Sequence, residues 1–279
     1  DESGQRIVDF QKHNLHILGY SEPVDEWLTM EELDSHLFSL PDQPNAIPYV
    51  TSYYERRWGF CLTHNQRKTL KPGNYHAVIN TDLKPGVLNY GELILLGELD
   101  QEVFLSTYIC HPSMANNELS GPVVTMALVQ WLATLDNHRY TYRIVFIPET
   151  IGSIVYLSKH LDHLKKHVIA GFNISCIGDD RVYSYLPSRD GNTLSDMAAL
   201  HVLKHIDLGF KHYTWLDRGS DERHYCAPGI DLPIATITRS KYGEYPEYHT
   251  SLDDLNLVTP SGLKGGFKAL KKTLDVIEK

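Results

Sequence analysis

The second part of the chain alternates short apolar runs with amphipathic segments, and this alternation restricts the possible folds more than any other feature. The expected strands are 103–109, 142–147, 169–177 and 232–237, and the expected helices are 120–135, 153–160, 193–205 and 263–277. In the first helix, Val124, Leu128 and Leu132 recur at the spacing of one helical face. Strands and helices in alternation predict an α/β fold with a mostly parallel sheet, covered by helices on both faces.

The first 92 residues have a different pattern, which predicts a small antiparallel β subdomain. Two Leu-Lys-Pro-Gly turns, at 70–73 and 83–86, precede expected strands at 75–81 and 87–96. Further short strands are expected at 6–10 and 15–18. Thr29 and Glu32 form a capping-box pattern, so a short helix is expected within 29–40. The predicted domains are therefore 1–92, mainly β-rich, and 93–279, an α/β catalytic domain.

Composition excludes several classes of partner. The formal net charge of −9 gives no basic surface for nucleic acid or an anionic membrane. No apolar run reaches the length needed to span a bilayer. The four cysteines are widely spaced and form no CxxC pair, so a reduced, cytoplasmic protein is expected. The chain starts without Met or a signal peptide, as a piece of a longer protein would.

Polar residues follow the expected strands at the points where the strands end. His111 follows the first strand, Glu149 the second, and Asp179 the third, while two later polar segments lie at 219–223 and 245–254. In open α/β sheets the functional site lies beyond the carboxyl ends of the strands. Imidazole and carboxylate groups at one edge are what a hydrolytic zinc site needs.

Each of these residues alone also has an ordinary structural explanation. A histidine at a strand end is more often simply hydrogen bonded, and Asp221 could cap a helix. Arg223 could form a salt bridge with a neighbouring acid. It is the order and spacing of the whole set that favour a functional site.

Those segments resemble the zinc aminopeptidases of the M28 type over roughly the last 180 residues. The matching runs, in order, are Ala115 to Gly121, Glu149 to Ser153, Ser220-Asp221, Gly229 to Pro233, and Tyr248 to Asp253. More closely, the chain resembles the aminopeptidase-like family catalogued as DUF4910 and DUF2172. Members of that family share the Cys-His-Pro-Ser, Pro-Glu-Thr-Ile-Gly-Ser, Gly-Ser-Asp-Glu-Arg and Glu-Tyr-His-Thr-Ser-Leu-Asp-Asp runs seen here. They also carry a C-terminal winged-helix domain.

The resemblance implies roles for residues at matching positions. His111 and His249 match metal-ligand histidines, and Glu149 matches the general base that takes a proton from zinc-bound water. Asn117 stands where the family has the aspartate that bridges two zinc ions. Thr150 and Ser175 stand where two further carboxylate ligands are found.

Three anionic ligands are thus missing, and two divalent ions a few ångströms apart repel strongly without them. One zinc ion is therefore expected rather than two. Its carboxylate ligand is left open among Glu149, Glu118, Asp221 and Asp179. If Glu149 is the ligand, Glu118 or Glu222 would have to act as the base.

The expected reaction is hydrolysis of the amide bond next to a free amino group, in a small peptide or aminoacyl-type substrate. The acids Glu118, Asp221 and Glu222 would suit the amino group. Tyr248 and Arg223 could hold the oxyanion or a substrate carboxylate.

Other functions remain open from the sequence. The substituted ligands also suit a metal-binding pseudoenzyme or binding module, which would bind metal without turnover. A single zinc ion also suits an amidohydrolase or acyl-transfer enzyme acting on an amino sugar or polysaccharide precursor. If the two histidines lie far apart, no metal is expected.

Overall fold

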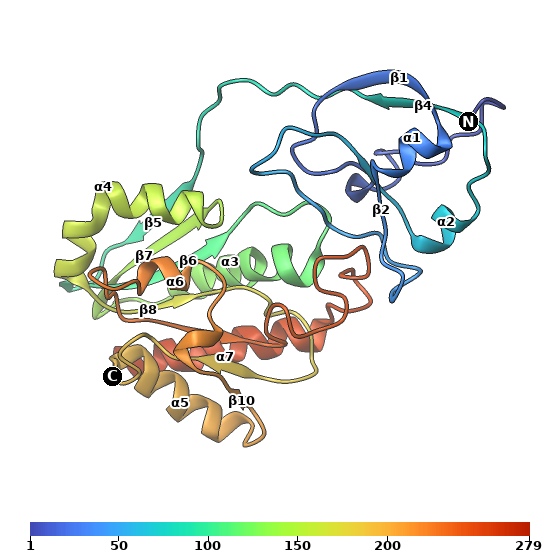
Figure 1. Ribbon diagram of the computed structural model, residues 1–279. Coiled ribbons are helices and arrows are strands. Elements are labelled where there is room, and N and C mark those ends of the chain that lie inside the picture. The colour runs from blue at the N-terminus through green and yellow to red at the C-terminus, as the bar shows by residue number, and fades with distance from the viewer. The chain divides into compact units, whose positions relative to one another are not determined.

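The computed structural model describes residues 1–279, which form two compact units (Figure 1). The larger unit comprises residues 88–111, 115–246 and 255–279, and the smaller unit comprises 1–87, 112–114 and 247–254. No helix in the chain combines the length and the apolar character needed to cross a bilayer.

The larger unit is built on a seven-stranded sheet. Its strands, in spatial order, are β10 (Lys211–His212), β9 (Ser184–Leu186), β11 (Ile234–Thr238), β8 (Val168–Asn173), β6 (Leu99–Tyr108), β7 (Tyr140–Ile147) and β5 (Gly91–Leu95). The central strands β11, β8, β6 and β7 all run parallel, whereas β5 and β9 pair antiparallel with their neighbours β7 and β11. The mostly parallel sheet predicted from the sequence is therefore confirmed.

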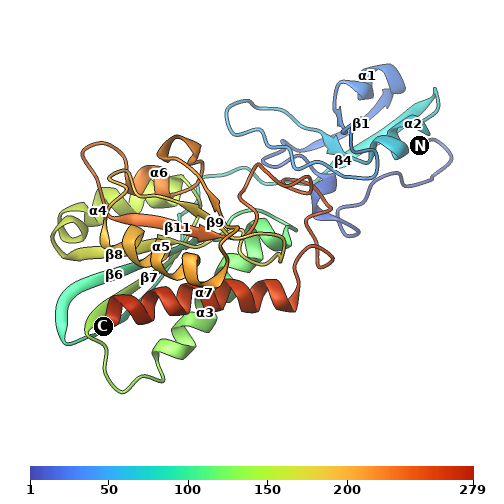
Figure 2. The same ribbon diagram turned by 90° about the horizontal axis from the view of Figure 1, so that it is seen from below.

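Helices cover both faces of this sheet, as Figures 1 and 2 show. One face holds α3 (Ser120–Leu132), α5 (Leu194–Ile206) and α7 (Pro260–Glu278), and the other holds α4 (Ile151–His167) and α6 (Glu222–Tyr225). Strand β6 contributes side chains to the apolar cores on both faces of the sheet, because successive side chains of a strand point to opposite faces. Val103 and Leu105 pack with the first group, and Phe104 packs with the second. A run buried on both sides has to be apolar throughout, which explains the sequence pattern.

Several boundaries differ from those expected. Strand β6 begins at Leu99 and α7 begins at Pro260, both earlier than expected, and α3 ends early at Leu132. Helix α4 runs on to His167, because Leu157, Leu161 and Leu164 continue its apolar face. Strand β8 ends at Asn173, and the chain then turns at Cys176, which has a φ of 46°. The strand expected at 87–96 is shortened to β5 and pairs with β7 at the edge of the large sheet.

The smaller unit contains two small sheets. Strands β1 (Val24–Thr29) and β4 (Asn74–Ile79) pair antiparallel, and β2 (Leu37–Phe38) pairs parallel with β3 (Phe60–Cys61). Alternate residues of β4, namely Tyr75, Ala77 and Ile79, are buried in its apolar core. Two short helices, α1 (Met30–Asp34) and α2 (His64–Lys68), complete the unit. The capping box at α1 is confirmed, with Thr29 and Glu32 bonded to each other's backbone N–H groups at 2.9 and 3.3 Å.

The strands expected at 6–10 and 15–18 were wrong. Residues 6–9 have no regular structure, and Asn14–His16 form a 3-10 turn, η1. The His13 imidazole accepts the Leu15 N–H at 3.2 Å and so starts this turn, which competes with an extended conformation. Ile17 makes only an isolated bridge to Phe60.

Candidate functional site

The loop after β6 carries His111, and a buried glutamate holds its backbone in place. The Cys110 and His111 N–H groups donate to the two carboxylate oxygens of Glu118 at 2.6 and 2.8 Å. Glu118 lies on a single π-helical turn, η2 (Ala115–Leu119), of a kind often found at functional sites. The Cys110 thiol and the Glu118 carboxylate also lie 2.7 and 3.3 Å from His111 Nδ1. On the other side of the ring, the imidazole Nε2 lies 3.6 Å from a Glu149 oxygen.

The Ser-Gly pair that follows η2 has a packing role. A Cβ on Gly121 would lie 2.4 Å from the Ile174 carbonyl oxygen, so only glycine allows α3 to come this close to the end of β8. The Ser120 hydroxyl accepts the Ile177 N–H at 2.9 Å and donates to the Asn116 carbonyl at 2.6 Å. These contacts fix η2, and with it Glu118, against the sheet.

Glu149 follows β7 at a strained turn. The next residue, Thr150, has a φ of 64°, which is rare for a β-branched side chain and is typical of strain at functional sites. Asp221 holds the turn, because its Oδ1 accepts the Thr150 N–H at 2.7 Å and the Ser153 hydroxyl at 2.8 Å. One Glu149 oxygen accepts the Ser220 hydroxyl at 2.7 Å, and the other lies 3.6 Å from His111 Nε2.

The site carries excess buried negative charge. Burial raises the pKa of Glu149, although the nearby His111 opposes the shift. Burial, and secondarily the charge of Glu149, raise the pKa of Asp221 to about 8. Asp221 is fully buried, and its Oδ2 has no hydrogen-bond partner. A buried carboxylate oxygen in this state is costly unless a proton or a cation accompanies it.

Glu222 is also fully buried, but its oxygens are already engaged. Asn173 donates to one of them at 2.6 Å, and the Tyr242 hydroxyl donates to the other. The Gly219 and Ser220 N–H groups lie 3.3 Å from that second oxygen. Asn173 and Tyr242 were not predicted as site residues. The expected strand 169–177 placed Asn173 inside the strand, whereas β8 ends at Asn173, at the edge of the sheet where functional residues lie.

Two other predicted residues lie in the larger unit. Asn117 is buried, and its amide group donates to the Tyr108 hydroxyl at 2.7 Å. Arg223 is exposed, and no carboxylate lies within ion-pair distance of it. Its only side-chain contacts are long, at 3.5 Å to the Thr150 hydroxyl and 3.3 Å to His224. The alternative explanation, a salt bridge to a neighbouring acid, is not observed.

The remaining predicted residues, Tyr248 and His249, belong to the smaller unit. Their rings stack with centroids 3.9 Å apart, and the His249 carbonyl accepts the Tyr49 N–H at 2.8 Å. His249 has a φ of 56°, a second strained residue among those singled out from the sequence. A role for His249 in metal binding stays a prediction.

The larger unit offers the kinds of donor that one divalent cation uses. His111 Nε2 lies 3.6 Å from Glu149, and Asp221 has a buried oxygen without a hydrogen-bond donor. At this site, the group of three whose ligand atoms all lie within 4.8 Å of one another is Cys110, His111 and Glu118. Zinc accepts nitrogen and carboxylate oxygen ligands of this kind. A cation would also favour the ionised form of both carboxyl groups, whose pKa values are raised mainly by burial.

Comparison with known proteins identifies the family. The model described as Domain of unknown function (DUF4910) matches residues 2–279. The chain belongs to the DUF4910 family. This DUF4910 chain is 38% identical over 278 residues to a Clostridium acetobutylicum protein, named as a candidate polysaccharide biosynthesis protein with aminopeptidase-like domain. The match covers 100% of this chain but only 63% of that protein's length.

Solved structures agree with the family assignment. A crystal structure of a candidate peptidase from Clostridium acetobutylicum matches with a TM-score of 0.96 and 38% identity, covering 100% of this chain and 65% of that one. A zinc aminopeptidase from Bacillus subtilis matches with a TM-score of 0.62 and 13% identity, covering 87% of this chain and 63% of that one. The DUF4910 chain therefore has the aminopeptidase-like fold, which it shares with this zinc aminopeptidase, as the motifs indicated.

Proposed function

We propose that this chain carries the active site of a single-zinc aminopeptidase-like hydrolase, which cleaves the amide bond next to a free amino group. The observation that carries the proposal is the buried Asp221 Oδ2, which has no partner, in a site it shares with Glu149 and His111. Zinc bound there would polarise a substrate carbonyl and lower the pKa of a water molecule.

Asp221 is the best replacement for the carboxylate ligands missing from the sequence. Glu118 is committed to two backbone N–H groups, and Glu222 to Asn173 and Tyr242. Asp179 accepts two bonds from Ser240 and others from Asn116 and Arg181. Of these four carboxylates, only Asp221 keeps a buried oxygen without a donor. His111, Asp221 and the Asn117 carbonyl oxygen would hold the ion, and His249 is the predicted second imidazole ligand.

Glu149 would act as the general base. The Ser220 hydroxyl fixes one of its oxygens and leaves the other on the side of His111 Nε2. The raised pKa of Glu149 suits a group that takes a proton from water and passes it to the leaving amine near neutral pH. Glu118 and Glu222 then position His111 and the 219–222 segment, instead of binding substrate directly.

Arg223 and Tyr248 remain proposed substrate-binding residues. The exposed guanidinium of Arg223 lacks a carboxylate partner and can form paired hydrogen bonds with the carboxylate of a short peptide. This would favour small substrates with a free carboxyl end. Tyr248 would contribute its hydroxyl to the developing oxyanion.

The direct test is metal content together with turnover. We expect about one tightly bound zinc ion per chain, measured by mass spectrometry of metals after dialysis, and hydrolysis of aminoacyl or dipeptide substrates. His111→Ala, Asp221→Asn and His249→Ala should each reduce bound zinc. His205→Ala, on the exposed end of α5, is the matched control. Wild-type protein that binds no zinc would contradict the proposal, and zinc without turnover on any substrate would favour the pseudoenzyme.

A second candidate reaction is deacylation of an amino sugar. It is favoured by the reference to polysaccharide biosynthesis in the name of the Clostridium acetobutylicum relative. The same ligands and base would serve, since an N-acyl amino sugar also presents an amide carbonyl. Assays with N-acetylated sugars alongside the aminoacyl substrates distinguish the two reactions.

A further inference from the structure

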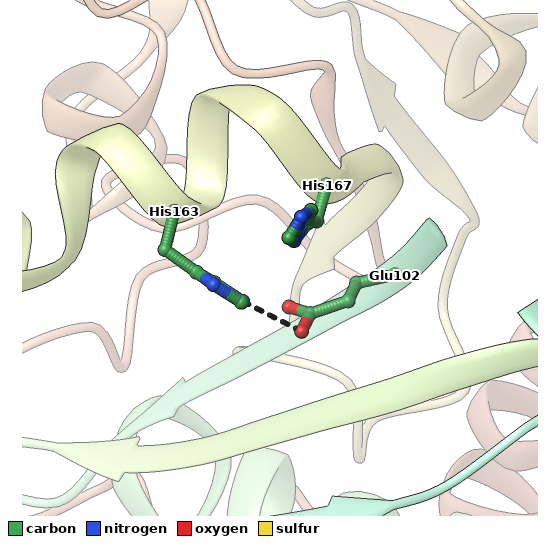
Figure 3. A group of neighbouring side chains, drawn as sticks. All are labelled: Glu102, His163 and His167. Carbon is green, nitrogen blue, oxygen red and sulfur yellow. Dashed lines mark hydrogen bonds and ion pairs between the residues drawn. The ribbon is translucent and has the colours of Figure 1, made fainter. Parts of the chain in front are cut away.

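A second cluster of ligand-type side chains lies on the same sheet, away from the site just described. Glu102 is on the amino-terminal half of β6, and His163 and His167 are on the last turns of α4 (Figure 3). One nitrogen of each imidazole and one Glu102 oxygen all lie within 4.8 Å of one another. The first candidate site lies beyond the other end of β6.

The helix itself brings the two imidazoles together. Residues four apart lie on the same face of a helix, and here the rings of His163 and His167 have centroids 4.3 Å apart. Two histidines at this spacing on one helix form a recurrent zinc-binding pair. Glu102 supplies the third donor from the neighbouring strand, with its Oε1 2.8 Å from His163 Nε2. Zinc commonly takes such a set of two imidazoles and one carboxylate, with water as the fourth ligand.

The charges around the cluster also allow a cation. Arg143 holds Glu102 through two hydrogen bonds of 2.7 and 2.9 Å, which fixes the carboxylate as an outer-sphere partner would. Arg143 also donates to Glu92 at 2.6 Å, so two carboxylates share one guanidinium. The group therefore carries a net negative charge before any ion binds. Burial alone would raise the pKa of Glu102, but the hydrogen bonds from Arg143 and His163 lower it overall, so the carboxylate is ionised.

We propose that Glu102, His163 and His167 form a second zinc-binding site, independent of the catalytic one. The ion would bind both His163 Nε2 and Glu102 Oε1 and would replace the direct contact between these two atoms. Zinc bonds of about 2.1 Å at tetrahedral angles place ligand atoms about 3.4 Å apart, so the 2.8 Å pair must open slightly. His163 can make this movement because 42% of its side chain is exposed, and the same exposure lets the ion enter.

Arg143 should limit the zinc affinity of this second site. Its Nη2 lies 3.0 Å from His163 Nε2, so its positive charge opposes a bound cation. The second site should therefore bind zinc more weakly than the first, in which no arginine is paired with the carboxylates. Calorimetric titration of untagged, metal-free protein with zinc should show two classes of binding.

Variants assign each class to its site. His163→Ala and His167→Ala should each weaken the second class by at least about ten-fold, since each removes one of three protein ligands. Both should leave the first class unchanged, whereas His111→Ala should remove only the first. His201→Ala is the matched control, because His201 and His205 are also four residues apart on a helix, with centroids 4.6 Å apart, but belong to no three-ligand group.

Thermal unfolding gives a second, independent measurement. Zinc should raise the melting temperature of His111→Ala, because a ligand that binds only the folded state stabilises it, and should not raise that of the His111→Ala/His167→Ala double variant. Unchanged zinc binding in both His163→Ala and His167→Ala would overturn this proposal without touching the proposed function. If wild-type protein showed only the weaker class of zinc binding, the proposed function would be contradicted and the second zinc site would stand.

Discussion

The two polar clusters of the larger unit use the same residue types, but their charges are balanced in opposite ways. Glu102 is buried with a guanidinium and an imidazole as partners, and its pKa is lowered. Asp221 and Glu149 are buried with each other and one imidazole, and their pKa values are raised. Glu102 lies on β6 and Glu149 on the loop that precedes α4, whereas Asp221 directly precedes α6.

This difference separates a structural role from a functional one. A buried carboxylate that is paired with a guanidinium, as Glu102 is, is stable without a metal ion and stabilises the fold, even where an ion can also bind. A cluster that lacks a counter-charge is destabilising until a proton, a cation or a substrate supplies it, and such sites are typical of catalysis. The comparison predicts that substitutions around Glu102 reduce stability, and that substitutions around Glu149 and Asp221 reduce activity.

The largest expected effect is on turnover by Glu149→Gln. The amide cannot accept a proton, so kcat should fall by about 10²- to 10⁴-fold, the usual contribution of a general base. The fold and bound zinc should remain, since Gln can still accept the Ser220 hydroxyl. The measurement is steady-state kinetics on the best aminoacyl substrate, with the exposed Glu98→Gln as control. Full activity in Glu149→Gln would remove this residue from the mechanism.

The next largest expected effect is a loss of stability in Arg143→Ala, which removes the guanidinium that pairs with Glu102. The change leaves Glu102 buried without its main partner, which should cost about 3–5 kcal/mol of the free energy of unfolding. Urea denaturation measures it. Arg189→Ala is the matched control, because Arg189 pairs with Asp231 at the surface and should cost no more than about 1 kcal/mol. Equal losses from the two variants would mean that the Arg143 cluster is not structural.

Much of the fold could be predicted because the deciding signals are local. The apolar runs that become β6 and β7 are buried on both faces, and α5 starts one residue from its expected position, whereas α7 starts three residues earlier than expected. The failures have local causes too. Arg6 to Phe10 has a strand-like composition but finds no partner strand, and pairing depends on distant residues that composition does not reveal.

The site could be predicted only in part. His111 and Glu149 lie where the strand-end rule put them, with ring nitrogen and carboxylate 3.6 Å apart. The state of each carboxylate could not be predicted, because it depends on which donors the fold delivers. Asp221 and Glu222 are adjacent in sequence, yet Tyr242 and Asn173 occupy the oxygens of Glu222 while one oxygen of Asp221 stays without a donor.

The third prediction concerns stability against pH in metal-free protein. Asp221 has a pKa of about 8 in the folded state against 3.8 when unperturbed, so the folded protein holds a proton that the unfolded chain has lost. This group therefore destabilises the fold progressively as pH rises from about 4 to about 8. Glu102 has a lowered pKa, so its contribution to folding stability changes with pH in the opposite direction. It stabilises the fold at neutral pH and loses this contribution in acid.

Asp221→Asn should remove the loss of folding stability that Asp221 causes as the pH rises. Its stability relative to wild type should increase by roughly 2–4 kcal/mol between pH 5 and pH 8, since each unit of pKa shift is about 1.4 kcal/mol. Urea denaturation in the presence of a chelator measures the difference. Added zinc should reverse the order at pH 8, because only wild type retains the ligand. A parallel pH dependence of the two proteins would show that Asp221 is not the uncompensated carboxylate.

The smallest effect tests the one exposed cation near the unbalanced cluster. Arg223 lowers the pKa of Glu149, so Arg223→Gln should raise that pKa and leave more of the base protonated on the acidic side. Interactions of exposed charges are worth about 0.2–1 kcal/mol, so kcat/KM should fall by no more than about five-fold at low pH and recover at high pH. Arg223→Lys should keep the wild-type profile, because it keeps the charge. The effect should also shrink with added salt, which screens an exposed charge. These outcomes apply to aminoacyl substrates that have no free carboxyl end. With a dipeptide, Arg223→Gln should add a loss that is the same at every pH and is not rescued by lysine, because the paired donors would also bind the substrate carboxylate. An equal loss with both kinds of substrate would contradict carboxylate binding by Arg223.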